Sequence, residues 1–363
     1  MRIAIVSNGF ADGPAQALRD YLVRDGAEVV TVFHPLTAEQ GTTHVITTYT
    51  EGRRSSERRV RVPLRPPASF ALDTLVPLRP PRADIWFGFN PLACARGIVS
   101  RSGRVVLWSV DFVPDRFGSG TMPTRFYDKV DRFCCRHADA RVELSPAARD
   151  ARNERHGLGD APALIVPMGA WIDRVPTTSD DSFREGRVVF LGHLVPRQGV
   201  ATLLEALDGR PADVIGTGPL EAELRARAPE NVTFHGYVAD HRDVERILSR
   251  AAVGVAPYAQ TDDTFSRYAD PGKLKAYLAA GLPIVLTDVP PNASELAAEA
   301  GAEIVDDDAG ALGAAIKRAL ESPDEWRARR AAALAYARRF DWSVLLGDAL
   351  AKLDVRPTTN PAR

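Results

Sequence analysis

The chain has 363 residues, 45% hydrophobic and 26% charged, which is typical of two globular domains and excludes a disordered chain. Its formal net charge of −1 excludes a general attraction to nucleic acid. Cys94, Cys134 and Cys135 lack the spacing of a disulfide framework or a metal site, so we expect a reducing, cytoplasmic compartment. No signal peptide or long apolar run is recognisable, so no membrane span is expected.

The first half of the chain alternates strands with amphipathic helices. The stretch RIAIVSNGF predicts a strand, and GPAQALRDYLVRDG then places Ala15, Leu18 and Leu22 at helical spacing before Gly26. The same order continues with predicted strands over 28–33, 84–89, 104–110 and 140–145, and with helices over 125–137 and after Pro146. This alternation predicts a parallel sheet that helices cover on both faces.

Residues 51–81 interrupt this alternation with many prolines and with six arginines between Arg53 and Arg65. We expect an irregular excursion from the first domain. Two interpretations are open: a solvated loop, or a basic surface for a phosphorylated acceptor or an anionic membrane.

A second polar passage, over 176–186, predicts the linker between the two halves. Beyond it the alternation restarts, which predicts a second doubly wound α/β domain. Its expected strands lie over 187–192, 213–218, 231–238, 253–258, 283–289 and 302–305. The predicted layout is a domain over 1–175, the linker, a domain over 187–340, a helix over 341–355 and a flexible tail over 356–363.

In an open parallel sheet, ligands bind at the carboxyl ends of strands, where loops offer backbone N–H groups. The loops predicted there cover 7–13, 109–120, 192–199, 216–221, 235–240, 257–273 and 287–295. The first of them, SNGFADG, is not a G-x-G-x-x-G fingerprint, which counts against a dehydrogenase.

Two lysines stand out in YADPGKLKAYLAAG, because the chain has only five. Asp270 and Pro271 predict the start of a helix over 271–280, with Asp270 as its N-cap. Lys273 then lies at the helix mouth, where its ammonium is a plausible phosphate ligand, and Lys275 projects about 200° away. The alternative for Lys273 is a solvated side chain in the first helical turn.

Asp111 ends a strand that reads as buried, beside Phe112 and Pro114. An acidic side chain is poorly solvated there unless it faces a ligand site. We therefore assign Asp111 to a substrate-binding surface of the first domain; a structural cap for the following turn is the alternative.

A resemblance adds to this interpretation. The segments VVFLGHLVPRQGVATLLEAL, VIGTGPLEAEL, NVTFHGYV, VGVAPY and PGKLKAYLAAGLPIVLTDVP resemble, in order and spacing, the donor domain of retaining nucleotide-sugar glycosyltransferases of the GT-B type, group 1 or family 4-like. The resemblance implies two Rossmann-like domains facing a cleft, with the donor mostly against the second domain and the acceptor on the first. It also implies that the last helix crosses back to the first domain.

The implied activity is transfer of a sugar from a nucleotide-diphosphate donor to a hydroxyl acceptor, with retention, in glycan, polysaccharide or glycolipid assembly. Catalytic roles are implied for Asp111, Lys273 and Arg197. The implied donor-binding residues are Asn8, Gly9, Gly192, His193, Gly216, Thr217, Gly218, Tyr237, Val238, Tyr258, Asp270, Gly272 and Leu274. We expect no metal and no cofactor besides the nucleotide sugar, because TDDT at 261–264 is not an Asp-x-Asp element at a strand end.

The sequence departs from the family at several positions. The usual Arg and Lys of the loop after the first donor-domain strand are replaced at His193 and Gln198, with Arg197 displaced by one. The family's paired glutamates would fall at Tyr268 and Ala276. Lys273 would therefore carry more of the phosphate charge than its equivalent usually does.

These departures leave two alternatives open: a nucleotide-sugar epimerase of the same fold, and a non-catalytic nucleotide-sugar-binding protein. An epimerase needs several acid and base groups around the sugar. The predicted loops contain Asp111, Asp115, His193, His235, Asp262, Asp263 and Asp270. Among partners we expect no nucleic acid, and both a soluble and a lipid-linked acceptor, the latter with peripheral contact at the inner membrane face, are open.

Overall fold

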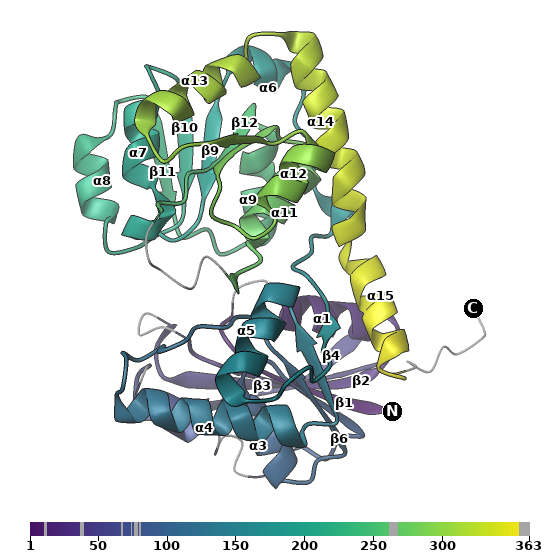
Figure 1. Cartoon of the computed structure of the whole chain (residues 1–363). Coiled ribbons are helices and arrows are strands. Elements are labelled where there is room, and N and C mark those ends of the chain that lie inside the picture. The colour runs from purple at the N-terminus through teal and green to yellow at the C-terminus, as the bar shows by residue number, and fades with distance from the viewer. Residues whose placement is uncertain are drawn as a thin grey trace. The chain divides into compact units, whose positions relative to one another are not determined.

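The computed structural model describes residues 1–10, 13–36, 40–66, 68–73, 75, 79, 81–260 and 268–355 (Figure 1). The chain forms two compact units. The first unit comprises Met1–Pro167 and Leu345–Arg363, and the second comprises Met168–Val344.

The first unit is built on an eight-stranded sheet in the order β4-β3-β2-β1-β5-β6-β7-β8. The strands are β1 (Arg2–Asn8), β2 (Glu28–His34), β3 (Thr43–Thr50), β4 (Arg53–Arg61), β5 (Ile85–Gly88), β6 (Arg104–Trp108), β7 (Ala140–Glu143) and β8 (Leu164–Ile165). All neighbouring pairs are parallel except β2 with β3 and β3 with β4. The five strands expected in this half are therefore confirmed, and three more are present: β3 and β4 at one edge and the short β8 at the other.

The helices of the first unit are α1 (Pro14–Arg24), α2 (Phe70–Asp73), α3 (Pro91–Val99), α4 (Met122–His137) and α5 (Pro146–His156). Local chemistry sets where several of them begin. Asn90 accepts a hydrogen bond from the Ala93 N–H, with Pro91 in the first turn, and Thr121 and Ser145 cap α4 and α5 in the same way. α3 and α4 pack on one sheet face through apolar residues such as Trp86, Cys94 and Leu107.

The expected irregular excursion over 51–81 is wrong at its start. Residues 53–61 form β4, an exposed strand that pairs antiparallel with β3 at the edge of the sheet. Arg54 and Arg59 both pair with Glu57, at 2.7 and 2.9 Å, which offsets part of the basic charge. Charged side chains on an exposed edge strand also hinder pairing with another sheet. This protection of the edge is sufficient to explain the arginines of β4 without a ligand.

The second unit holds six parallel strands in the order β11-β10-β9-β12-β13-β14. They are β9 (Val188–Leu191), β10 (Ala212–Ile215), β11 (Val232–Gly236), β12 (Val253–Ala256), β13 (Ile284–Thr287) and β14 (Glu303–Val305). Five of them lie within the stretches that the sequence predicts as strands, and β10 begins one residue before its predicted stretch. The predicted doubly wound parallel sheet is confirmed.

Helices cover both faces of this sheet (Figure 1). One face packs against α7 (Val200–Ala206), α8 (Glu221–Arg227) and α13 (Ala309–Ala319). The other packs against α9 (His241–Ser249), α11 (Gly272–Ala280), α12 (Ala293–Ala300) and α14 (Pro323–Ala337). Alternate residues of β9 serve the two faces: Phe190 packs on the first and Val189 on the second.

Residues 176–186, expected as a linker, lie inside the second unit and contain the capped helix α6 (Asp180–Glu185). The chain instead passes between the units after Pro167, and again along α15 (Trp342–Lys352), of which Leu345 and the following residues belong to the first unit. There, a guanidinium nitrogen of Arg104 donates to the Leu353 carbonyl. None of the helices in the described residues is long and apolar enough to span a bilayer.

Candidate functional site

Strand order alone marks one ligand position in each unit. In the second unit the chain runs outward from β9 through β10 to β11, and in the opposite direction from β12 through β13 to β14. The crevice at the carboxyl ends of β9 and β12 is therefore the topological switch point, where open α/β sheets bind ligands. The same rule marks the carboxyl ends of β1 and β5 in the first unit.

The loops at the second-unit switch point are packed backbone against backbone. A Cβ atom on Gly216 would lie 1.9 Å from the Gly192 carbonyl oxygen, and one on Gly218 would lie 2.3 Å from the Leu194 carbonyl oxygen. Gly216 also has φ +128°, which side chains rarely allow. Glycine at these positions is required by close approach of the two loops, so GTGP is explained by packing and is not by itself evidence for a ligand.

Lys273, in the first turn of α11, extends its side chain to this switch point. Its ammonium lies 4.2 Å from the ring centroid of Phe190 at the end of β9 and 4.7 Å from that of Tyr258 after β12. Its Nζ donates a hydrogen bond to Oε1 of Gln198. The two rings and the amide hold the cation beside the Gly192 backbone, where an added Cβ would be 2.9 Å from Nζ.

No carboxylate of the described residues pairs with Lys273, and burial lowers the pKa of its ammonium to about 7. An anion bound next to Nζ would supply the missing negative charge and raise that pKa again. The surroundings of Lys273 are therefore suited to a phosphate-bearing ligand rather than to a structural ion pair.

Lys275 differs from the expectation. It is 2% exposed, its ammonium contacts a carboxylate oxygen of Asp270, and it lies 4.6 Å from the ring centroid of Phe340. The second oxygen of Asp270 accepts a hydrogen bond from the Met168 N–H at 2.7 Å. The prediction that Asp270 caps α11 is therefore wrong: Pro271 is at the N-cap position, without a side-chain cap bond, and the Asp270 carboxylate neutralises Lys275.

Other predicted donor residues fall into three groups. Arg197 lies in the short 3₁₀ helix η3 (Pro196–Gln198) and is half-buried, and its carbonyl accepts from the Ala259 N–H. Leu274 is fully buried in the core and its N–H bonds to the Pro271 carbonyl, so it is not exposed to a ligand. His193 and Tyr237 are exposed; half-buried are Gly192, Thr217, Gly218, Val238 and Gly272.

The first-unit switch point contains a small cavity of about 100 Å³. Asn8, at the end of β1, accepts a 2.7 Å hydrogen bond from Asn90, just after β5. The other side of the cavity is formed by Asp111, which follows β6, and by aromatic rings that include Phe89 and Tyr127. Apolar walls with a few convergent polar groups are typical of a site for a small polar ligand. Gly9, also predicted here, has φ +97° and donates to the His34 carbonyl.

The Asp111 carboxylate forms an ion pair. Its carboxylate lies 2.6 Å from Nη2 of Arg116, and both side chains are about a quarter to a third exposed. Although burial favours neutral Arg116, the Asp111 carboxylate and the Tyr127 hydroxyl raise the pKa of Arg116 above its ordinary value. Within the described residues the Asp111 side chain thus pairs with a cation in the cavity wall rather than capping the backbone of the following turn.

A buried ionic cluster that the sequence analysis does not identify supports the Asp111 backbone. Arg152, 2% exposed, lies 3.0 Å from Glu143 and also pairs with Asp131. Its Nη2 donates to the Asp111 carbonyl at 2.9 Å. The one usable signal was the pair of charges in ARVELS, inside a strand that reads as buried, because buried charges require partners.

The remaining acidic and basic groups considered for an epimerase are mostly paired. His235 contacts Asp213 at 2.8 Å, and Asp115 pairs with Arg155 at 2.9 Å. Asp262 and Asp263 lie outside the described residues.

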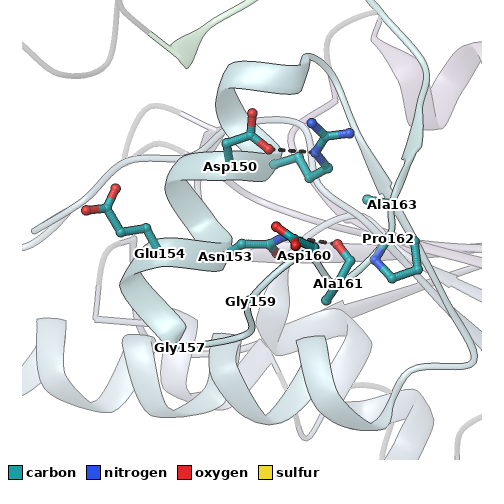
Figure 2. Close-up of a pocket in the computed structure, with 10 residues that line it drawn as sticks. Asp150, Asn153, Glu154, Gly157, Gly159, Asp160, Ala161, Pro162 and Ala163 are labelled. Atoms are coloured by element: carbon teal, nitrogen blue, oxygen red, sulfur yellow. Dashed lines mark hydrogen bonds and ion pairs between the residues drawn. The ribbon is translucent and has the colours of Figure 1, made fainter.

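A larger hollow of about 600 Å³ lies between α5 and the loop over 157–163 (Figure 2). Its polar groups bond to one another: Arg149 to Asp150 at 2.7 Å, and Asn153 to the Ala161 carbonyl at 2.9 Å. No predicted site residue lines it, so it adds nothing to the site.

Comparison with known proteins agrees with this geometry. Residues 185–322, which lie in the second unit, match the family described as Glycosyl transferases group 1. No curated protein sequence gives a significant match to the chain.

Several solved structures share the fold across nearly the whole chain. A sucrose-phosphate synthase from Thermosynechococcus elongatus is 17% identical with a TM-score of 0.74, over 98% of this chain and 99% of that one. HepE from Anabaena, solved with UDP-glucose, is 15% identical with a TM-score of 0.66 over 98% and 100%. A trehalose 6-phosphate synthase from Burkholderia multivorans is 16% identical with a TM-score of 0.66 over 97% and 96%. The chain has the GT-B fold of two Rossmann-like domains.

Proposed function

We propose that this protein is a glycosyltransferase that moves a sugar from a nucleotide-diphosphate donor to a hydroxyl acceptor, with retention at the anomeric carbon. The observation that carries the proposal is the Lys273 ammonium, held at the second-unit switch point by Phe190, Tyr258 and Gln198 without a carboxylate partner among the described residues. The group 1 match over 185–322 and the UDP-glucose complex of HepE support a nucleotide sugar as its ligand.

In this mechanism the second unit binds the donor and Lys273 stabilises the negative charge that develops on the departing diphosphate. A preorganised cation serves this purpose without reorganising during the reaction. Arg197, in the adjacent loop, is proposed to assist. Lys273 then performs the work that a metal ion performs in other transferases, so we propose that added Mg²⁺ is not required.

The first unit is proposed to bind the acceptor in the cavity between Asn8, Asn90 and Asp111. The pairing of Asp111 with Arg116 fixes the position of its carboxylate, which suits a hydrogen bond to an acceptor hydroxyl. Its role is therefore to orient the acceptor.

The test is an assay of the purified chain with a panel of nucleotide sugars and acceptors, with and without Mg²⁺. A transferase releases nucleoside diphosphate only when acceptor is present, and NMR of the product reports retention or inversion. An isomerised sugar without an acceptor would identify an epimerase, and tight donor binding without any turnover would identify a binding protein. Activity that appears only after Mg²⁺ addition would contradict the proposed role of Lys273.

The arginines of β4, residues 53–61, are relevant to whether the acceptor is soluble or membrane-bound. We propose reversible docking of β4 on an anionic membrane from a cytoplasmic location, as a lipid-linked acceptor would require, since each basic residue near such a surface contributes about 1 kcal/mol. Co-sedimentation with anionic vesicles should occur at low salt and disappear at high salt and in the Arg53→Ser, Arg54→Ser, Arg58→Ser, Arg59→Ser variant. Absence of binding at low salt would leave edge protection as the purpose of these arginines, with a soluble acceptor.

A further inference from the structure

Three buried side chains of the first unit meet behind the acceptor cavity. His34 ends β2, His44 is near the start of the neighbouring strand β3, and Asp73 ends α2. They are 1%, 0% and 3% exposed. The two Nδ1 atoms are 2.7 Å apart, His44 Nδ1 is 3.8 Å from Asp73 Oδ1, and one ligand atom from each residue lies within 4.8 Å of the others.

This cluster is not satisfied by its own contacts. Asp73 Oδ1 is buried and has no hydrogen-bond partner in the described part of the chain, and the same holds for Nε2 of both histidines. Only the second oxygen of Asp73 is used, as the acceptor of a 2.7 Å bond from the Asn8 amide. A buried carboxylate oxygen without a partner is costly, because no water replaces the lost hydrogen bond.

A divalent transition-metal ion between the two Nδ1 atoms and Asp73 would give the unpartnered carboxylate oxygen a partner. The Nδ1 atoms of His34 and His44 and the Oδ1 atom of Asp73 face one another, so each residue offers one ligand atom to a shared ion. Two imidazoles and one carboxylate form a ligand set that zinc accepts, with one position left for water. Zn–N bonds of about 2.0–2.1 Å in tetrahedral geometry separate ligand atoms by about 3.3 Å, so the rings would part by roughly half an ångström.

We propose that His34, His44 and Asp73 form a structural zinc site. The ion would join three segments: the end of β2, the neighbouring strand β3 and the short helix α2. It would also fix the second oxygen of Asp73, which orients Asn8 and, through it, Asn90 at the cavity. The site is separate from the donor residues of the second unit and has no part in the proposed glycosyl transfer chemistry.

The test begins with the metal content of the full chain, produced in zinc-supplemented medium and freed of any affinity tag. We expect about one zinc ion per chain. After removal of the metal by a chelator, Co²⁺ should bind with 1:1 stoichiometry and give the strong visible absorption of a tetrahedral site. Zn²⁺ should also raise the melting temperature of the metal-free protein, because a ligand that binds only the native state stabilises it.

The diagnostic variant is Asp73→Asn, which keeps an oxygen to accept from Asn8 and removes the ligand charge. Its zinc affinity should fall by at least about 10–100-fold, the size of effect that even an outer-shell partner has. The matched control, His137→Gln, removes an exposed histidine of α4 and should keep full metal content. An equal loss in both variants would overturn the site.

If Asp73→Asn does not fold, the wild-type chain decides. Saturable 1:1 Co²⁺ binding with a tetrahedral spectrum supports the proposal. Purified protein with no bound metal and no saturable uptake of Zn²⁺ or Co²⁺ would overturn it and leave a hydrogen bond between two neutral histidines as the account of the cluster.

Discussion

Lys273 and Lys275 are two residues apart on α11, yet they occupy opposite electrostatic surroundings. Lys275 is buried against Asp270 and the Phe340 ring, and its charge is neutralised within the protein. Lys273 lies among Phe190, Tyr258 and Gln198 at the sheet's switch point, and no carboxylate of the described residues neutralises it. Burial alone therefore does not distinguish structure from function in this helix. What distinguishes the structural lysine from the proposed functional one is whether a carboxylate neutralises its charge.

The same criterion separates the two switch points. The first unit places paired groups around its cavity, Asn8 with Asn90 and Asp111 with Arg116. The second unit leaves a cation without an anionic partner among the described residues. This difference is what we expect if one unit receives a neutral hydroxyl compound and the other a diphosphate.

The largest effect is expected from breaking the neutralised pair. Lys275→Met leaves the Asp270 carboxylate buried without its cation, and loss of one partner of a buried ion pair typically costs about 3–5 kcal/mol. We expect a free energy of unfolding lower by that amount in urea or guanidinium titrations.

The double variant Lys275→Met, Asp270→Asn sharpens this prediction. It removes the stranded charge but keeps an acceptor for the Met168 N–H, so it should recover a large part of the lost stability. If Lys275→Met unfolds like the wild type, the pair with Asp270 does not stabilise the fold and the contrast between the two lysines disappears.

Lys273→Met should have the opposite effects to Lys275→Met: lower activity without lower stability. Removing a preorganised donor typically costs about 2–4 kcal/mol of transition-state stabilisation, so kcat/KM should fall by roughly 30- to 1000-fold. The unfolding free energy should not fall, because methionine fills the same space without a buried charge. The matched control is Lys317→Met on the exposed face of α13, which should keep full activity. Equal rates in the two variants would show that Lys273 has no part in the reaction.

Asp111→Asn tests the first unit with a smaller effect. We expect turnover to fall roughly 10- to 100-fold, because a misplaced acceptor loses the orientation that the reaction needs. The free energy of unfolding should change by less than about 1 kcal/mol, since the pair with Arg116 is part-exposed. A large drop in melting temperature with normal turnover would instead favour a structural cap.

The sequence predicted the second unit well because its signals are local. Runs such as VVFL and PIVLTD are continuous β-branched segments bounded by Gly and Pro, and each contains an observed strand. Lys273 could likewise be placed at the mouth of α11 from Asp270, Pro271 and helical spacing alone.

The errors arose where distant contacts decide. Asp270 was predicted as the cap of α11 from its place before Pro271, but its carboxylate pairs with the buried Lys275, which also lies against the ring of Phe340, far along the chain. The strand at 53–61 was missed because β4 is exposed along nearly its whole length, so no hydrophobic alternation marks it, and only pairing with β3 forms it. His34, His44 and Asp73 come from three segments that only the tertiary fold brings together.

The central claim is that Lys273 is a cation without an anionic partner among the described residues that binds the diphosphate. The most direct test is the number of protons taken up when a nucleoside diphosphate binds. Free Lys273 has a pKa of about 7, so at pH 8 it is mostly neutral, whereas a bound diphosphate favours the ammonium. Calorimetry of UDP, GDP or ADP binding at pH 8, in buffers of different ionisation enthalpy, should therefore give uptake of about 0.9 proton per site. Uptake should shrink toward pH 6, where Lys273 is already charged, and vanish in Lys273→Met. Equally tight binding without proton uptake by the wild-type chain at pH 8 would contradict the assignment of Lys273 to the diphosphate.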